Sequence, residues 1–184
     1  MLRPLSAIAA LALAATPLAA DEITDTLDSA KQAYEEGDVA YALEELEYAK
    51  QQMLALKTDA LSAYLPPAPD GWSREMNTDM NAGLAMMGGG VGAEAEYSGD
   101  GQSFTIRLMA DNPMVGAMSG MIGNAALMGA KIVRVGRQKY MLQDNQMSAL
   151  IDHRILVQAE GAPQEVMQPL LETIDYRALS GFGR

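Results

Sequence analysis

Apolar residues recur at helical spacing in two consecutive runs between residues 21 and 64. The first run stops before Gly37, and the second starts at Val39 and keeps the same period to about Tyr64. Glycine is the usual residue where a helix ends in a left-handed conformation. The pattern therefore predicts two antiparallel helices joined at Gly37. Their apolar positions include Leu27, Ala30, Ala33, Tyr34, Val39, Ala42, Leu43, Leu46, Ala49 and Met53.

Farther along the chain, polar and apolar residues alternate with the period of two that is typical of strands. Residues 93–98 and 102–110 alternate on either side of a Gly-Asp-Gly turn, which predicts a hairpin. A second hairpin is predicted for residues 131–135 and 138–142, and shorter strands for 147–151 and 154–159. The break between the two shorter strands lies at Asp152 and His153. A final helix is predicted from Gln164 to about Ile174.

These elements define the expected fold class and the division of the chain. The polar residues of each predicted strand lie on one face, which indicates a sheet with one face exposed to solvent. Such a sheet is typically antiparallel. We expect an α+β protein, in which an N-terminal antiparallel helical hairpin precedes an antiparallel sheet with helices packed on one face. The proline-rich residues 66–71 cannot continue a helix, so they separate the hairpin (21–65) from the α+β domain (72–184). Residues 73–92 keep a weak helix-like spacing that ends in a glycine-rich segment, interpreted as a flexible linker.

The hairpin segment AYEEGDVAYALEELEYAK, residues 33–50, resembles one tetratricopeptide-type repeat. The matching positions are Ala33, Tyr34, Gly37, Ala42 and Ala49. The resemblance covers roughly 25 to 30 residues and has no second copy, whereas a solenoid needs about three repeats. It implies two closely packed helices, but not the peptide-binding groove of that family. We expect the hairpin to dock on its own domain or to pair with another copy.

An uncharged segment, residues 112–130, lies between the strands and carries the most unusual residues of the chain. As a helix it places Met114, Met118, Met121, Ala125 and Met128 on one stripe and glycines on the other. A methionine stripe is most often a plastic packing surface, and a groove for a protein or a lipid-like ligand is the second interpretation. Its glycines, Ser119 and Asn124 favour a buried helix over a membrane span.

Two further site hypotheses concern these methionines and Trp72. Thioethers select Cu(I) or Ag(I), so Met114, Met118 and Met121 are candidate ligands of a copper site. Trp72, the sole tryptophan, is expected to pack at the edge of the core, with ligand stacking as the alternative. The apolar binding surface that we predict consists of Met114, Met118, Met121, Met128 and Trp72.

The N-terminus predicts export. Arg3, an apolar stretch and the small residues before Asp21 have the layout of a signal peptide, residues 1–20, cleaved between Ala20 and Asp21. The expected location is the periplasm, with no integral membrane span in the mature chain. No cysteine is present, so disulfides and thiol chemistry are excluded.

Charge excludes a further class of partner. The chain carries −11, and residues 21–50 alone hold ten acidic and two basic residues. Such acidity argues against nucleic acid, which needs clustered Lys and Arg. The bases Lys131, Arg134, Arg137 and Lys139 gather around one predicted hairpin, where they could meet the acidic helices within the chain or in a dimer.

Catalytic signatures are weak. His153 beside Asp152 is the only general-base candidate, and no serine lies in a GxSxG motif. The sequence therefore favours a periplasmic, non-enzymatic binding or accessory protein without a cofactor. In this hypothesis the acidic hairpin mediates association, and the methionine-lined surface receives a protein or lipid-like partner. Copper handling is the alternative, and a hydrolase using His153 is the last.

Overall fold

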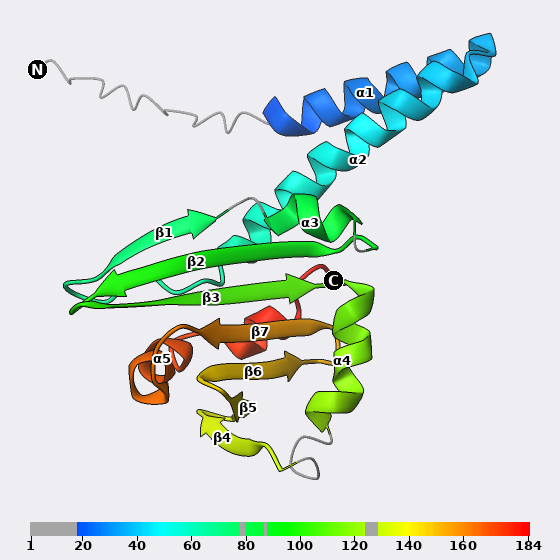
Figure 1. Cartoon of the computed structure of the whole chain (residues 1–184). Coiled ribbons are helices and arrows are strands. Elements are labelled where there is room, and N and C mark those ends of the chain that lie inside the picture. The colour runs from blue at the N-terminus through cyan, green and yellow to red at the C-terminus, as the bar shows by residue number, and fades with distance from the viewer. Residues whose placement is uncertain (1–17, 78–79, 87, 124–128) are drawn as a thin grey trace, which may run out of the picture. The chain divides into compact units, whose positions relative to one another are not determined.

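The computed structural model describes residues 18–77, 80–86, 88–123 and 129–184 (Figure 1). The chain divides into two compact units, Met1–Met53 and Leu54–Arg184. The division falls within a helix, so the predicted linker at residues 66–71 and the boundary between compact units are different places.

The N-terminal unit is the predicted helical hairpin. Helices α1 (Leu18–Glu36) and α2 (Val39–Ser62) are joined at Gly37, whose φ of 86° is the left-handed conformation that the prediction required. Asp38 begins α2, because its Oδ1 accepts a hydrogen bond from the Tyr41 amide at 3.1 Å. Since α1 begins at Leu18, the predicted cleavage site lies in its first turn.

Small side chains allow the two helices to approach closely. Ala30 and Ala33 of α1 and Ala42 and Ala49 of α2 are at most 5% exposed. We call these four residues the alanine seam. With no bulk between the axes, the larger apolar residues on either side of the seam project outward instead of filling the interface.

The C-terminal unit contains a seven-stranded sheet with every neighbouring pair antiparallel. The order is β1-β2-β3-β7-β6-β5-β4 (Figure 1). Both predicted hairpins are confirmed, and so is the break at Asp152 and His153. The strands are β1 (Ser73–Asn77), β2 (Val91–Gly99), β3 (Gln102–Ala110), β4 (Lys131–Val135), β5 (Gln138–Gln143), β6 (Gln146–Ile151) and β7 (Ile155–Glu160).

One face of this sheet forms the main core. Tyr97, Ile106, Val157 and Met147 lie on it and are completely buried. Helices α5 (Gln164–Leu171) and α6 (Tyr176–Ser180) contribute Met167 and other apolar residues to the same cluster. The helix predicted from Gln164 to about Ile174 corresponds to α5, which ends at Leu171. Helix α6 is an additional helix, and Asp175 caps it by accepting hydrogen bonds from the amides of Arg177 and Ala178.

The end of α2 and the chain after it also belong to this core. Leu61 and Leu65 are 0% and 3% exposed and pack in the same cluster. The Tyr97 hydroxyl donates to the Pro66 carbonyl at 2.7 Å, and Arg74 donates to the carbonyls of Leu65 and Pro66. The first residue of the predicted linker, Pro66, is therefore hydrogen-bonded to side chains of the sheet.

The opposite face of the sheet is more polar. Arg107 bridges Glu94 and Glu160 across three neighbouring strands. Helix α3 (Met80–Met86) covers Gly92 at one side of this face, and α4 (Pro113–Gly123) contacts β6. Figure 1 shows α4 in front of the sheet and α6 behind it. The α+β class is confirmed, with the helices shared between both faces.

Candidate functional site

The methionine helix is present as α4, and the helix residue that it buries fully is Val115, not Met114 or Met118. Asn112 caps α4 by accepting a hydrogen bond from the Met114 amide at 2.8 Å. Val115 is 1% exposed, whereas Met114 is 50% exposed and Met118 is half-buried. The inward face is thus turned by one residue, about 100°, from Met114. The side chain of Met121, and Ala125 and Met128 altogether, lie outside the described residues.

Trp72 packs at the edge of the core, as the first interpretation expected. Its ring meets Phe104 edge to face, with centroids 5.6 Å apart, and also covers Gly99, where an added Cβ would be 2.5 Å from the ring. Phe104 lies near the start of β3, and α4 follows the other end of that strand. At about 3.4 Å per residue, six residues of strand place the two ends roughly 20 Å apart. Trp72 and Met114 therefore lie near opposite ends of β3.

His153 and Asp152 form the tight turn between β6 and β7. Both have positive φ, 56° and 49°, as expected for the two central residues of a type I′ hairpin turn. The Asp152 carboxylate is paired with Arg184. This geometry gives both residues a role in the turn, and it pairs the Asp152 carboxylate with an arginine.

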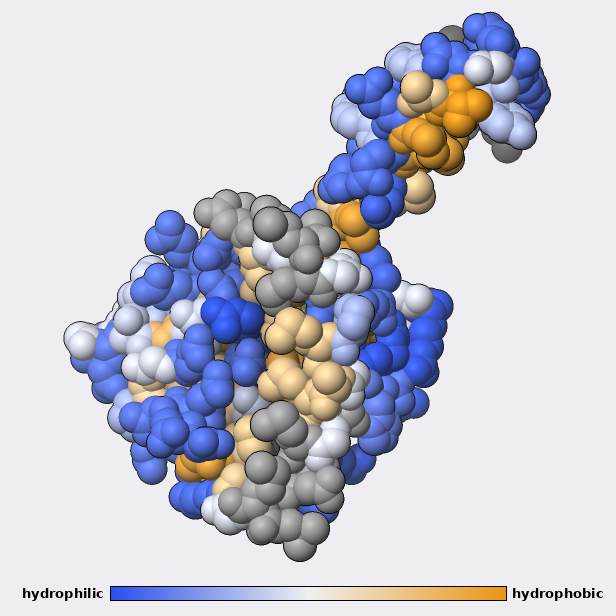
Figure 2. Space-filling model, turned by 45° about the vertical axis from the view of Figure 1, so that its right-hand side comes forward, coloured by the Kyte–Doolittle hydropathy of each residue, from blue (hydrophilic) through white to orange (hydrophobic). Residues whose placement is uncertain are grey.

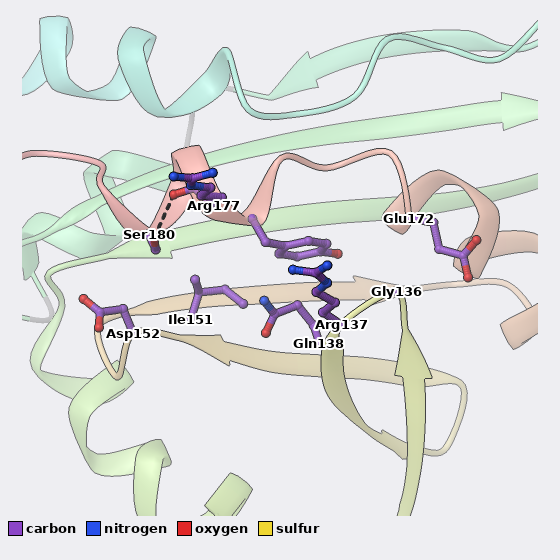
Figure 3. A pocket seen from close by; sticks show the side chains of 9 residues that line it. Gly136, Arg137, Gln138, Ile151, Asp152, Glu172, Arg177 and Ser180 are labelled. Carbon is purple, nitrogen blue, oxygen red and sulfur yellow. Dashed lines mark hydrogen bonds between the residues drawn. The ribbon is translucent and has the colours of Figure 1, made fainter.

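A cavity of about 460 Å³ lies between the β4–β5 turn, the β6–β7 turn and α6 (Figure 3). Arg137 reaches it from the β4–β5 turn, Gln138 from the start of β5, and Arg177 and Ser180 from α6. Ser180 donates to the Arg177 carbonyl at 2.7 Å (Figure 3), so its hydroxyl proton is already used within the helix.

Tyr176, which lines this cavity, and Tyr140, which is buried beside it, both form hydrogen bonds that hold the fold together. Tyr176 donates to the Leu171 carbonyl and shares a 2.8 Å hydrogen bond with Tyr140. Burial raises the pKa of Tyr176 to about 12 and that of Tyr140 well above its ordinary value. Both hydroxyls are therefore neutral at physiological pH and serve as cross-links between the sheet and α6.

The predicted basic cluster is gathered on the β4–β5 hairpin. Arg134 and Lys139 are directly opposite each other, and Lys131 and Arg137 are exposed nearby. Because β4 is an edge strand of the sheet, these charges disfavour pairing of its free edge with another strand. This arrangement explains the cluster without requiring contact with the acidic helices.

Another apolar surface, among the described residues, lies on the helical hairpin. A groove of about 420 Å³ runs between α1 and α2, beside the alanine seam. Tyr34, Val39, Leu43 and Leu46 are 69%, 52%, 62% and 47% exposed. Figure 2 shows this apolar patch on the hairpin, bordered by hydrophilic side chains. The lining residues are Leu27, Ala30, Lys31, Tyr34, Val39, Ala42, Leu43 and Leu46, and we call this the hairpin groove.

Carboxylates dominate the margins of the hairpin groove. Both lysines of residues 21–50 are paired within their own helix, Lys31 with Glu35 at 3.8 Å and Lys50 with Glu47 at 3.0 Å. Hydrogen bonds from Gln51 and then Lys50 lower the pKa of Glu47. Glu47 therefore stays ionised, and its charge lies one helical turn from the lining residue Leu43.

Sequence reasoning did not identify the hairpin groove as a site. The helical spacing of these residues was recognised in the sequence. Spacing alone does not show which of them face the partner helix and which are exposed. The available signal was an apolar stripe too wide for one helix–helix interface, with alanine at its centre and larger residues beside it.

Comparison of the chain with known protein families, curated proteins and solved structures gave no match. The two helices are packed as the repeat resemblance implied, and no comparison identifies them as a tetratricopeptide repeat. Within the described ranges, no helix is long and apolar enough to cross a membrane. In the same ranges no three acidic or histidine side chains converge as metal ligands.

Proposed function

We propose that this protein is an exported, non-enzymatic binding protein whose acidic helical hairpin receives a protein partner in the hairpin groove. The observation that carries the proposal is the distribution of exposed apolar side chains. Among the described residues, nine large exposed ones lie on α1 and α2 and three lie elsewhere. A contiguous exposed apolar patch rimmed by polar residues is typical of an interaction site.

Export rests on the N-terminal residues 1–20, whose charge and apolar pattern is that of a signal peptide. The non-enzymatic assignment is supported by the way in which the polar candidates are used. Asp152 is held by Arg184 in a turn, and Tyr140 and Tyr176 are bonded to each other. Each has a structural partner where a catalytic role needs a group directed at a substrate.

Site-specific cross-linking in cells tests the proposal. A photoreactive residue replaces Leu43, which lines the hairpin groove, or Tyr41, which is 46% exposed and lies two residues away, about 200° round the same helix. We expect a protein adduct from position 43 and none from position 41, and loss of that adduct in a Val39→Ser background. Equal adducts from both positions, or none from position 43, would overturn the assignment.

The methionine surface of α4 is a second candidate, because Met114 is 50% exposed at the first turn of the helix. A protein or a lipid-like ligand would contact it through soft, adaptable side chains. Copper handling needs Met114, Met118 and Met121 to bind one ion. Titration of the purified protein with Ag(I) separates these roles: micromolar or tighter binding that is lost in Met114→Leu supports the metal site, and weaker binding removes it.

A further inference from the structure

We infer that the occupant of the hairpin groove is an amphipathic helix of a partner protein with basic residues flanking its apolar face. The inference rests on the proposed function and specifies the chemistry of the partner. It follows from three features of the hairpin groove: what its walls offer, how long it is, and which charges border it.

The walls require an occupant that satisfies its own backbone. Both are α-helices, whose amides and carbonyls are bonded along the helix, so the groove has no free strand edge to pair with. An extended peptide would gain no main-chain hydrogen bonds there, whereas a helix brings its own. A third helix laid against two antiparallel helices also fills a groove of this kind by interdigitation of side chains.

The length of the lining sets the spacing of the anchors. On α1 the lining runs from Leu27 to Tyr34, and on α2 from Val39 to Leu46. Each is seven residues of helix, roughly 10 Å at 1.5 Å per residue. A docked helix covers that distance in two turns, so three apolar residues at positions i, i+3 or i+4, and i+7 contact the lining.

The borders determine the charge of the partner. Asp28 and Glu35 each lie one helical turn from Lys31, and Glu47 lies one turn from Leu43, so both margins carry exposed carboxylates. Lys31 and Lys50 neutralise part of this charge by pairing with glutamates of their own helices. Residues 21–50 still carry a net charge of −8, from ten acidic and two basic residues. Lys or Arg beside the apolar face of the partner would meet these carboxylates.

The same charge argues against a second copy of this hairpin as the occupant. Two hairpins placed groove to groove would bring two −8 segments together, and like charges across an interface oppose binding. Electrostatic complementarity also predicts a salt-dependent association, because the pairs at the margins are exposed.

The test is a titration of the full-length mature protein with two labelled 15-residue helical peptides, followed by fluorescence anisotropy. Both carry leucine at i, i+3, i+7 and i+10 on an alanine background, with flanking lysines in one and glutamates in the other. We expect micromolar binding of the lysine peptide, at least tenfold weaker binding of the glutamate peptide, and severalfold loss of affinity between 50 and 300 mM salt.

Three matched variants assign the contact. Leu43→Ser with Leu46→Ser removes two anchors and leaves the charge unchanged, and we expect at least a tenfold rise in Kd. Asp28→Asn with Glu47→Gln changes only the margins and should raise Kd severalfold. Tyr41→Ser lies off the groove and should leave Kd within twofold. Circular dichroism verifies that each variant is folded, which the high exposure of all five positions favours.

The inference is overturned by equal binding of both peptides, by unchanged affinity after the two leucine substitutions, or by a dimer in sedimentation that the leucine substitutions dissociate. If these failures occur while the adduct from position 43 persists, only the chemistry of the occupant is wrong. If the adduct is also absent, the proposed function fails with it.

Discussion

Asp111, in the connection between β3 and α4, ties together three parts of the C-terminal unit. Its carboxylate accepts hydrogen bonds from Lys57 of α2 at 2.9 Å and from Nε of Arg154 at 3.0 Å. Arg154 also donates to the Phe182 carbonyl at 2.8 Å. Partial burial raises the pKa of Asp111, but the hydrogen bonds from Lys57 and Arg154 outweigh it and leave the pKa below its ordinary value. The ionised carboxylate therefore stabilises the fold.

We expect Asp111→Asn to lower the free energy of unfolding at pH 7 by about 1–2 kcal/mol. Asparagine tolerates the positive φ of 57° at this position, so the substitution removes the charge with little strain on the backbone. Hydrogen bonds to charged groups contribute about 1.5–3 kcal/mol. Asp111 and Arg154 are 31% and 23% exposed, so solvent screening reduces that contribution.

The dependence on pH has a definite sign. A carboxyl group whose pKa is lower in the folded than in the unfolded state contributes stability above the unfolded pKa, about 3.9, and loses it as pH falls through the folded pKa. The difference between the natural protein and Asp111→Asn should therefore be constant from pH 7 to about 5 and disappear near pH 2. Urea unfolding followed by Trp72 fluorescence measures it at each pH.

A double-mutant cycle with Arg154→Met isolates the pair, with an expected coupling of about 1 kcal/mol. A coupling below the error of about 0.3 kcal/mol, or a difference that does not shrink on acidification, would refute the role of the ionised carboxylate.

Other parts of the fold make three further predictions. Gly92→Ala should cost about 1 kcal/mol of unfolding free energy, because the Met80 and Leu84 side chains of α3 must shift to admit the added Cβ, whereas Gly83→Ala meets nothing within 4 Å and should be neutral or stabilising. Ala49→Leu should lower the thermal midpoint of the hairpin in circular dichroism by overfilling the alanine seam, and Ala40→Leu, on an exposed position, should not. Because the pKa of Tyr176 is raised to about 12, stability should fall between pH 10 and 12 by up to about 1.4 kcal/mol per pH unit from this residue. A titration of phenolate absorbance alongside unfolding checks this, and ionisation of all tyrosines near pH 10 would contradict it.

Hairpins were predictable because their turns have a local chemical cause. Asp100 and Gly101, like Asp152 and His153, adopt positive φ between alternating strands, and such residues tolerate that conformation. Strand β1 has no comparable signal. All five of its residues are exposed, so its sequence carries no contrast between an inner and an outer face. It is a strand only because its backbone pairs with β2, and that partner cannot be read from residues 73–77.

Both candidate surfaces show where helical periodicity stops being informative. In α4 the stripe through Met114 and the stripe through Val115 each fit a helix, and they differ by one residue in phase. Contact with the sheet selects Val115. In the hairpin, the alanine seam uses the small residues for the helix–helix interface and leaves Leu43 and Leu46 outside. Periodicity identifies the faces of a helix, but the number of faces that are covered depends on how many elements pack around it.

Truncation tests whether the last residues of α2 belong to the hairpin or to the core of the C-terminal unit. Fragment 54–184 is the C-terminal compact unit, whereas fragment 72–184 begins after the predicted linker. The shorter fragment lacks Leu61 and Leu65, which are 0% and 3% exposed, and burial of a leucine contributes about 1.5–3 kcal/mol. It also removes the carbonyl that Tyr97 binds at 2.7 Å.

Together these losses amount to about 4–7 kcal/mol, which reaches the lower part of the stability of an ordinary domain, about 5–15 kcal/mol. We therefore expect 54–184 to unfold cooperatively and 72–184 to bind a hydrophobic dye without a cooperative transition. A synthetic peptide of residues 54–71 added to the shorter fragment should restore the transition, whereas a peptide in which both leucines are serine should not. Equal unfolding midpoints for the two fragments would show that the end of α2 does not belong to the core of the C-terminal unit, and the hairpin would then extend to the prolines, as the sequence pattern by itself predicts.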